Sequence, residues 1–231
     1  MISNFKVSDK IGDIVTVFPG ASNLFLEYRI DFCCGGNRPL IEAIKEQNLD
    51  ENKILALLNE RFKEFQEKSE EFTDWVKEKP SKLVDYIEGT HHAYLKEELP
   101  KISDLAFKIL KVHGKRHEEL FKVHKLFNTL RTELEEHLVK EEELLFPIIK
   151  EYETEKSNYN KEKVLNLLNE LDKEHTGAGD IIKELREVTE HYIAPKDACK
   201  TFELTYKKLR ELELDTFQHI HLENNILFKN I

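Results

Sequence analysis

The sequence has little of what marks secreted, membrane-spanning or nucleic-acid-binding proteins. Its three cysteines, two of them adjacent, do not make the disulfide framework of a secreted domain. No apolar run reaches membrane-spanning length, and residues 1–10 lack the apolar core of a signal peptide. A net charge of −10 leaves no basic face to neutralise phosphates. We therefore expect a cytoplasmic protein whose main partner is neither a membrane nor a nucleic acid.

Helical patterns fill most of the chain and predict an all-α fold in two parts. Short helices are predicted at residues 7–17, 21–28, 40–47 and 50 to about 65. They would form a small helical N-terminal domain, residues 1–65, followed by a charged and weakly periodic linker, residues 66–80. Residues 81–231 are predicted to form a four-helix bundle whose helices begin near 81, 117, 162 and 195, the third ending near 191, with a loop at 156–160.

The pattern H-x-x-x-E-x-x-x-L-F occurs twice in the predicted bundle, starting at His137 with Glu141 and at His219 with Glu223. Four residues make slightly more than one helical turn, so each His and Glu share one helix face. A further histidine precedes each copy at nearly the same distance, His92 in the first half and His175 in the second. Each half of the predicted bundle thus offers two imidazoles and one carboxylate. Together the two halves supply the ligand types of a carboxylate-bridged di-iron pair.

All six candidate ligands fall on apolar stripes that should face the bundle axis. The stripe of the second bundle helix contains Leu120, Val123, Phe127, Leu130, Leu134, His137, Glu141, Leu144 and Ile148. A single histidine on such a face is more often a hydrogen-bonded core residue than a ligand. Six His and Glu positions on four helices favour a metal site, because burying two carboxylates without a cation would cost several kcal/mol each.

Four imidazoles and two carboxylates suit iron better than the common alternatives. Structural zinc takes four ligands and often thiolates, whereas magnesium and calcium prefer oxygen shells. If both glutamates bridge two iron ions together with an oxo or hydroxo group, each iron keeps one position for an exogenous ligand. Manganese or a mixed centre stays open on ligand type alone.

Residues near the candidate ligands carry weaker hypotheses. His91 lies on a polar flank of its helix, so His92 is the preferred ligand. Glu133 and Glu174 could orient a ligand from behind or line an access path, although most such glutamates only solvate a helix.

The adjacent cysteines Cys33 and Cys34 have two interpretations. They are either part of a turn in which Gly35 and Gly36 supply unusual backbone angles, or an exposed thiol pair for redox chemistry, metal handover or an intersubunit site.

Together these motifs resemble the Repair of Iron Centers family, and the resemblance covers essentially the whole chain. Asp31-Phe32-Cys33-Cys34-Gly35-Gly36 looks like the signature of that family's N-terminal domain. The segments HLVKEEELLFP at 137–147 and HIHLENNILF at 219–228 look like its two hemerythrin-like ligand segments. His92 and the pair Glu174-His175 match its two single-histidine positions.

The resemblance implies a hemerythrin-like bundle, a set of ligand roles and a function. The terminal iron ligands would be the histidines and the bridges the glutamates of the set His92, His137, His175, His219, Glu141 and Glu223. Family members are homodimeric cytoplasmic stress proteins that restore iron–sulfur clusters damaged by nitric oxide or peroxide. The expected partners are therefore damaged iron–sulfur proteins, to which the labile di-iron centre would supply iron.

Two alternatives remain beside iron donation. One is a redox enzyme that reduces nitric oxide or peroxide at the open metal positions. The other is a hemerythrin-like carrier or sensor of small ligands such as oxygen or nitric oxide. A pure carrier needs no double-cysteine domain, so that domain favours the donor over the carrier. Between donor and enzyme the sequence makes no choice.

Overall fold

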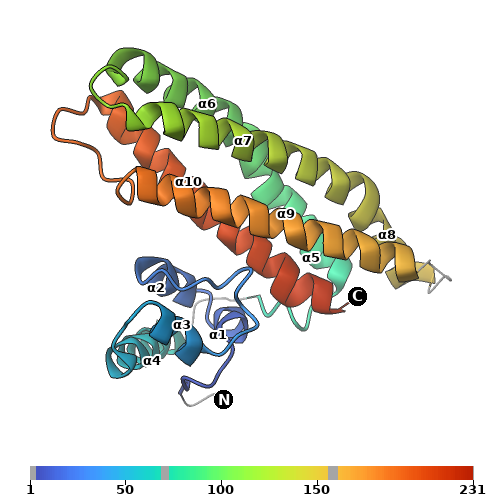
Figure 1. The fold of residues 1–231 in the computed structure, drawn as a ribbon. Helices are drawn as coiled ribbons and strands as arrows, with labels where there is room; N and C mark the ends of the chain where they lie inside the picture. The colour runs from blue at the N-terminus through green and yellow to red at the C-terminus, as the bar shows by residue number, and fades with distance from the viewer. Residues whose placement is uncertain (1–3, 69–72, 156–160, 231) are drawn as a thin grey trace. The chain divides into compact units, whose positions relative to one another are not determined.

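The computed structural model describes residues 4–68, 73–155 and 161–230, which form helices joined by turns (Figure 1). Within these ranges the extended pairing is confined to an isolated antiparallel bridge between Lys10 and Pro39. The all-α prediction is therefore confirmed. No helix in the described part of the chain is long and apolar enough to cross a membrane. The loop predicted at 156–160 lies outside the described residues.

The chain divides into two compact units. One contains the chain up to Leu83 together with the segment from Phe217 onward, and the other is Val84–Thr216. The helix α10, Lys200–Leu222, runs without a break through the boundary. The domain limits expected from the sequence, 1–65 and 81–231 around a linker at 66–80, stay a prediction.

The second unit contains a four-helix bundle made of α6, α7, α9 and the first part of α10 (Figure 1). α5 (Pro80–Ile87) leads through a π-helical turn η1 (Glu88–His92) into α6 (Ala93–His113). α7 (Glu119–Lys140) leads through a second π-helical turn η2 (Glu141–Leu145) into α8 (Phe146–Glu155). α9 is Lys161–Val188, and α10 is followed by a third π-helical turn η3 (Glu223–Leu227) and a short 3₁₀ turn η4 (Phe228–Asn230).

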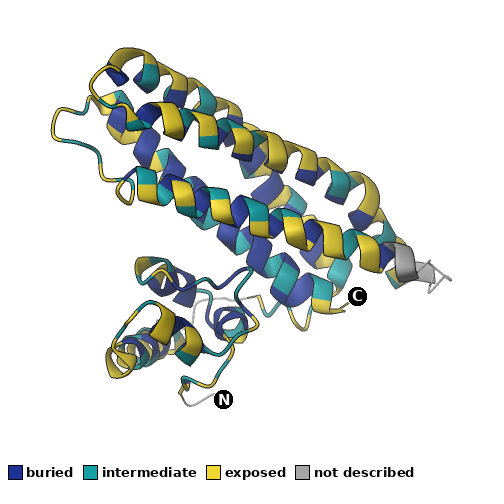
Figure 2. Ribbon diagram, in the orientation of Figure 1, coloured by how far each residue is buried: buried dark blue, intermediate teal, exposed yellow. Residues whose placement is uncertain are grey.

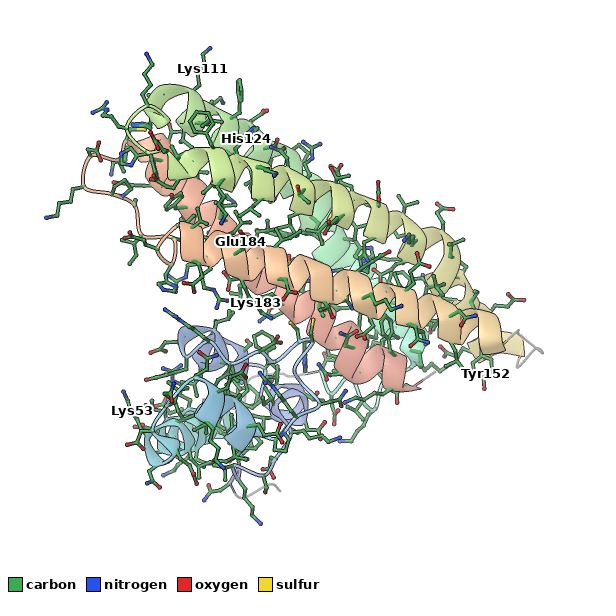
Figure 3. All side chains as sticks on the ribbon, in the orientation of Figure 1. Lys53, Lys111, His124, Tyr152, Lys183 and Glu184 are labelled. Atoms are coloured by element: carbon green, nitrogen blue, oxygen red, sulfur yellow. The ribbon has the colours of Figure 1, made fainter. Side chains whose placement is uncertain are left out.

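Each bundle helix buries most of the apolar stripe that its sequence predicts (Figure 2). The buried apolar positions include Leu95, Leu99 and Ile102 on α6, Phe127 and Leu130 on α7, Leu171 and Ile182 on α9, and Leu209 and Leu212 on α10. The outer faces carry charged side chains such as Lys111 and Glu184, which are exposed (Figure 3). Burial of these stripes is the main favourable free-energy term that holds the four helices together.

Two bundle helices differ from their predicted limits. α9 ends at Val188 and not at residue 191, because Glu190, His191 and Tyr192 adopt positive φ values of 47°, 63° and 61°. A left-handed backbone cannot continue a right-handed helix. α10 begins at Lys200 and not at Pro195, because the chain first makes a turn in which Ala198 N donates to Pro195 O.

The first unit contains four short helices, α1 (Ile11–Val17), α2 (Ala21–Glu27), α3 (Leu40–Glu46) and α4 (Glu51–Lys68). The predicted cap of α4 is present, since Asp50 Oδ1 accepts a hydrogen bond from Lys53 N at 3.0 Å. α1 starts four residues later than predicted, because Asp9 N donates to Lys6 O in a turn before it. In the core of this first unit, the aromatic rings of Phe5, Phe18 and Phe62 pack together.

The π-helical turn η2 changes which residues of the second bundle helix are buried. Leu144, expected on the inward stripe, is half exposed, and Ile148 is only partly buried, whereas Leu145 and Ile149 are buried. At about 100° per residue, each step of four residues overshoots a full α-helical turn by about 40°. The extra residue of a π-helical turn cancels that drift and keeps His137, Glu141 and Leu145 on one face. The predicted stripe was therefore wrong beyond Glu141.

This register gives a direct test by substitution at two adjacent leucines. Leu145 is fully buried and Leu144 is 50% exposed. We expect Leu145→Ala to lower the free energy of unfolding by about 2–5 kcal/mol, because it leaves a cavity. Leu144→Ala, the matched control, should change it by less than about 0.5 kcal/mol. Urea unfolding followed by circular dichroism measures both, and equal losses would contradict the π-helical register.

Candidate metal centre

The three π-helical turns carry three of the six predicted ligands. η1 ends on His92, η2 begins with Glu141, and η3 begins with Glu223. His137 and His219 lie one turn before the two glutamates, near the ends of α7 and α10. Turns of this type are frequent at functional sites, because the inserted residue redirects a side chain within an otherwise regular helix.

The structure brings the six predicted ligands into two overlapping groups. In each group, one ligand atom from each member lies within 4.8 Å of one ligand atom from every other member. The groups are His92, Glu141, His219 and Glu223, and His137, Glu141, His175 and Glu223. All six side chains are buried, and both carboxylates are fully enclosed. Each group therefore has two imidazoles of its own, and the two carboxylates belong to both groups.

The closest approaches within these groups are made by the Nε2 atoms of the histidines. His92 Nε2 and His137 Nε2 each lie 3.3 Å from Glu141 Oε2. His219 Nε2 lies 2.9 Å from Glu223 Oε1. His175 Nε2 lies 3.1 Å from His137 Nε2. The same ring nitrogen of each histidine is thus directed at the shared carboxylates or at another imidazole.

Two glutamates outside the ligand groups, here called the outer glutamates, contact the Nδ1 atoms of two ligand histidines: Glu142 contacts His92 and Glu174 contacts His137. Glu142 Oε1 lies 2.8 Å from His92 Nδ1, and Lys96 Nζ lies 2.6 Å from the same oxygen. Burial raises the pKa of Glu142, but the hydrogen bonds from Lys96 and His92 outweigh burial and leave the pKa below its usual value. The carboxylate therefore stays charged and can accept a hydrogen bond from the Nδ1–H group of His92.

The second half of the centre repeats this arrangement. Glu174 Oε2 lies 2.9 Å from His137 Nδ1, and Lys140 also donates to Glu174. The hydrogen bonds from His137 and Lys140 lower the pKa of Glu174 to about 2. His92–Glu142–Lys96 and His137–Glu174–Lys140 are therefore matching triads that keep the proton on Nδ1.

The contacts of both ring nitrogens of His137 fit a cation beside its Nε2 atom. With its proton on Nδ1, His137 presents an Nε2 lone pair to Glu141 Oε2 and to His175 Nε2. Lone pairs and carboxylate oxygens that face one another in a buried site repel unless a positive charge lies between them. A mixed nitrogen and oxygen donor set suits iron, manganese or zinc better than calcium or magnesium. The described residues thus contain a site with the chemistry of a transition-metal centre.

Other predicted or considered residues lie apart from the two groups. Glu133 is exposed on α7, where partial burial raises its pKa. His91 is buried, not on a polar flank as predicted, and its Nδ1 lies 2.9 Å from Asp215 Oδ1. His113 Nε2 lies 3.2 Å from Cys199 Sγ, and His117 contacts Glu119 and Asp197.

The double-cysteine segment forms a turn over residues 34–37, as one of its two interpretations predicted, but other details of both interpretations differ. Cys33 is buried and not exposed, Cys34 is partly buried, and their Sγ atoms lie 3.8 Å apart. The hydrogen bond with Cys34, burial and the charge of Asp31 raise the pKa of Cys33, which favours the thiol. No described glycine has a positive φ, so Gly35 and Gly36 do not supply unusual backbone angles. A Cβ on Gly36 would lie 2.6 Å from Asn225 Oδ1, so close packing is what requires glycine there.

Sequence reasoning missed Glu142, Asn225 and the π-helical turns. The signal for the turns was the repeated four-residue spacing in H-x-x-x-E-x-x-x-L-F, which in a regular α-helix drifts around the axis by about 40° per step. Glu142 adjoins Glu141 as Glu174 adjoins His175, and this repeated adjacency could have identified it.

Comparison with known proteins identifies two matching regions. Residues 7–61 match a domain of unknown function (DUF542), and residues 83–231 match the hemerythrin HHE cation-binding domain. The iron-sulfur cluster repair protein ScdA of Staphylococcus haemolyticus is 34% identical over 230 residues, which cover 99% of this chain and 98% of the relative. A probable iron-sulfur cluster repair protein of Haemophilus influenzae is 33% identical over 224 residues, 96% of each chain. The iron-sulfur cluster repair protein YtfE of Escherichia coli O81 is 31% identical over 218 residues, 94% of each chain.

The outer triads predict how metal affinity responds to substitution. Glu142→Gln and Glu174→Gln keep the size of each side chain but remove the charge that accepts the Nδ1 proton. Loss of such a partner typically costs about 10–100-fold in metal affinity, which competition with a chelating dye can measure.

The exposed neighbour Glu143 supplies the matched control. Glu143→Gln should bind metal as the unmodified protein does. An equal loss of affinity in Glu143→Gln and Glu142→Gln would mean that overall charge, and not the triad, sets the affinity.

Proposed function

Since the chain belongs to the Repair of Iron Centers family, the family of the iron–sulfur cluster repair proteins ScdA and YtfE, we propose that it repairs damaged iron–sulfur clusters by donating iron. Near full-length similarity to curated repair proteins supports the cluster-repair part of this proposal. The observation that supports iron as the cargo is the pair of overlapping ligand groups that share both carboxylates.

We assign the iron ions to the two groups. One ion would be held by His92 and His219 and the other by His137 and His175, with Glu141 and Glu223 shared between them. This assignment is supported by the convergence of Nε2 atoms on the shared carboxylates and by the enclosed position of both glutamates. Bound iron is the cargo of the proposed reaction, and the residues serve to hold it until transfer.

The charge of the donor set supports a releasable store. Four imidazoles are neutral ligands, so the two shared carboxylates supply all the negative charge among the six residues. The outer glutamates add little net charge, because Lys96 pairs with Glu142 and Lys140 with Glu174. Reduction lowers the charge of an iron pair from six to four, which weakens its attraction to the same carboxylates. Release upon reduction therefore follows from a site with few anionic ligands.

The thiols Cys33 and Cys34 complete the proposal as groups that receive iron or contact the client. A cytoplasmic location is part of it, since a reducing compartment keeps adjacent cysteines as thiols. The clients would be damaged iron–sulfur proteins, and the family resemblance implies a homodimer.

A second candidate function is reduction of nitric oxide or peroxide at the same centre. Each group offers four protein side chains, two imidazoles and two shared carboxylates. Iron commonly accepts more ligands than four, so small molecules such as nitric oxide or oxygen could bind. This candidate differs from the donor because iron would stay in place during turnover.

Transfer of iron to an apo client separates the two candidates. The iron-loaded protein, mixed anaerobically with an apo iron–sulfur enzyme, sulfide and reductant, should restore the client's cluster absorption while losing its own iron. Reduced protein should also yield iron to a chelator faster than oxidised protein, because the charge of the ion pair falls. Turnover of nitric oxide with full retention of iron would instead support the redox enzyme.

Substitution of the shared carboxylates tests the assignment of ligands. Glu141→Ala or Glu223→Ala removes a group common to both ions and should lose one or both irons, as measured by metal analysis of the purified protein. His91→Ala should retain iron, because His91 contacts Asp215 and belongs to neither group. Iron loss in His91→Ala but not in His92→Ala would overturn the register of this helix.

A further inference from the structure

Asn225 lies two residues beyond Glu223 in the π-helical turn η3, and it is buried. It belongs to the same compact unit as the N-terminal helices and the double-cysteine loop. None of the metal-site assignments uses it. A buried side-chain amide needs hydrogen-bond partners, and the identity of those partners shows what the residue holds in place.

The partners of Asn225 lie in the loop that carries the two cysteines. Its Nδ2 lies 3.3 Å from Phe32 O and 3.1 Å from Cys33 O, and both contacts are buried. His221 Nδ1, one turn earlier on the same helix, lies 3.2 Å from the same Nδ2. One amide thus connects the carbonyl groups of two successive residues, Phe32 and Cys33, to the turn that begins with Glu223.

Two glycines make room for this amide. A Cβ on Gly12 would lie 2.5 Å from Asn225 Oδ1, and a Cβ on Gly36 would lie 2.6 Å from it. Gly12 N also donates to Gly36 O at 2.8 Å, which closes the loop onto the start of α1. The second glycine of Cys-Cys-Gly-Gly therefore admits the Asn225 side chain.

Further contacts join the end of α10 to the N-terminal part of the same unit. The ring of Phe32 meets the rings of Phe217 and His221 edge to face, with centroids 6.1 Å apart in each case. Gln218 Nε2 donates to Ser22 Oγ at 3.2 Å. Between these positions lie His219 and Glu223, which belong to the ligand groups. The end of this helix therefore carries both ligand residues and residues that contact the thiol loop.

We propose that Asn225 is a positioning residue that locks the Cys33–Cys34 loop onto the Glu223 turn, so that metal bound at Glu223 controls access to the Cys33 thiol. A cation held by Glu223 fixes the first residue of η3, and the short turn fixes Asn225 two residues later. Asn225 then holds the carbonyls of Phe32 and Cys33 and keeps Cys33 buried. This inference rests on the proposed function only in that it gives the thiols a state that depends on iron loading.

The test measures the rate at which iodoacetamide modifies each cysteine at one fixed pH, by peptide mass spectrometry. In metal-free protein, Asn225→Ala should modify Cys33 roughly tenfold faster, because two hydrogen bonds that close the loop are lost. Asn225→Asp has almost the same shape but cannot donate, and it should have the same effect. It serves as the second variant if Asn225→Ala does not fold, as judged by circular dichroism.

A second measurement adds Fe²⁺ anaerobically and repeats the modification. Iron should slow the modification of Cys33 in the unmodified protein and leave its rate unchanged in the Asn225 variants, provided that they still bind iron. This loss of coupling is a readout that a merely structural residue would not alter. Exposed Cys199 is the internal control, and its rate should be the same in all proteins.

Asn224→Ala is the matched control, because Asn224 is the same residue type one position earlier and is only partly buried. It should leave the Cys33 rate and its dependence on iron unchanged. The proposal is overturned if the Asn225 variants modify Cys33 at the unmodified protein's rate, or if iron leaves that protein's rate unchanged. Neither result depends on cluster repair, so failure of the proposed role of Asn225 can be distinguished from failure of iron donation.

Discussion

Two enclosed carboxylates, Glu141 and Glu223, are the constraint on which the rest of the centre depends. Burying a charged carboxylate without a counter-charge costs several kcal/mol, so the sequence can keep two of them only if something positive offsets that cost. Neutral imidazoles do not do this, and at His92 and His137 the Nδ1 atom faces Glu142 or Glu174, so the Nε2 lone pair is directed inward. Two cations shared by both carboxylates would satisfy every group at once.

The geometry of the helices follows from the same constraint. In a regular α-helix, a ligand histidine, a ligand glutamate and a core leucine at successive four-residue steps would drift around the axis by about 40° per step. The π-helical turns at Glu141 and Glu223 remove the drift and leave Leu145 and Leu227 buried. The turn at Glu223 also carries Asn225 toward the double-cysteine loop, so the same distortion serves the ligand groups and the thiol loop.

Much of this could be predicted from the sequence, because it depends on local periodicity. The apolar stripes predicted the bundle helices, and the two H-x-x-x-E patterns, with the histidine upstream of each, predicted the six candidate ligands that the structure brings together. Two of the features that sequence reasoning missed, Glu142 and Asn225, depend on partners far away in the chain. Glu142 matters because of Lys96, 46 residues earlier, and Asn225 because of the Cys33 carbonyl, 192 residues earlier. Likewise, the left-handed residues that end α9 are Glu190, His191 and Tyr192, and none of them is a glycine that would have predicted this backbone conformation.

The most direct test of the paired centre is anomalous X-ray scattering from crystals of iron-replete protein, with data collected on either side of the iron absorption edge. Two adjacent iron peaks are expected, one bounded by His92 and His219 and the other by His137 and His175, with Glu141 and Glu223 contacting both. A single peak, or no iron signal at these residues, would contradict a pair of ions held by shared carboxylates.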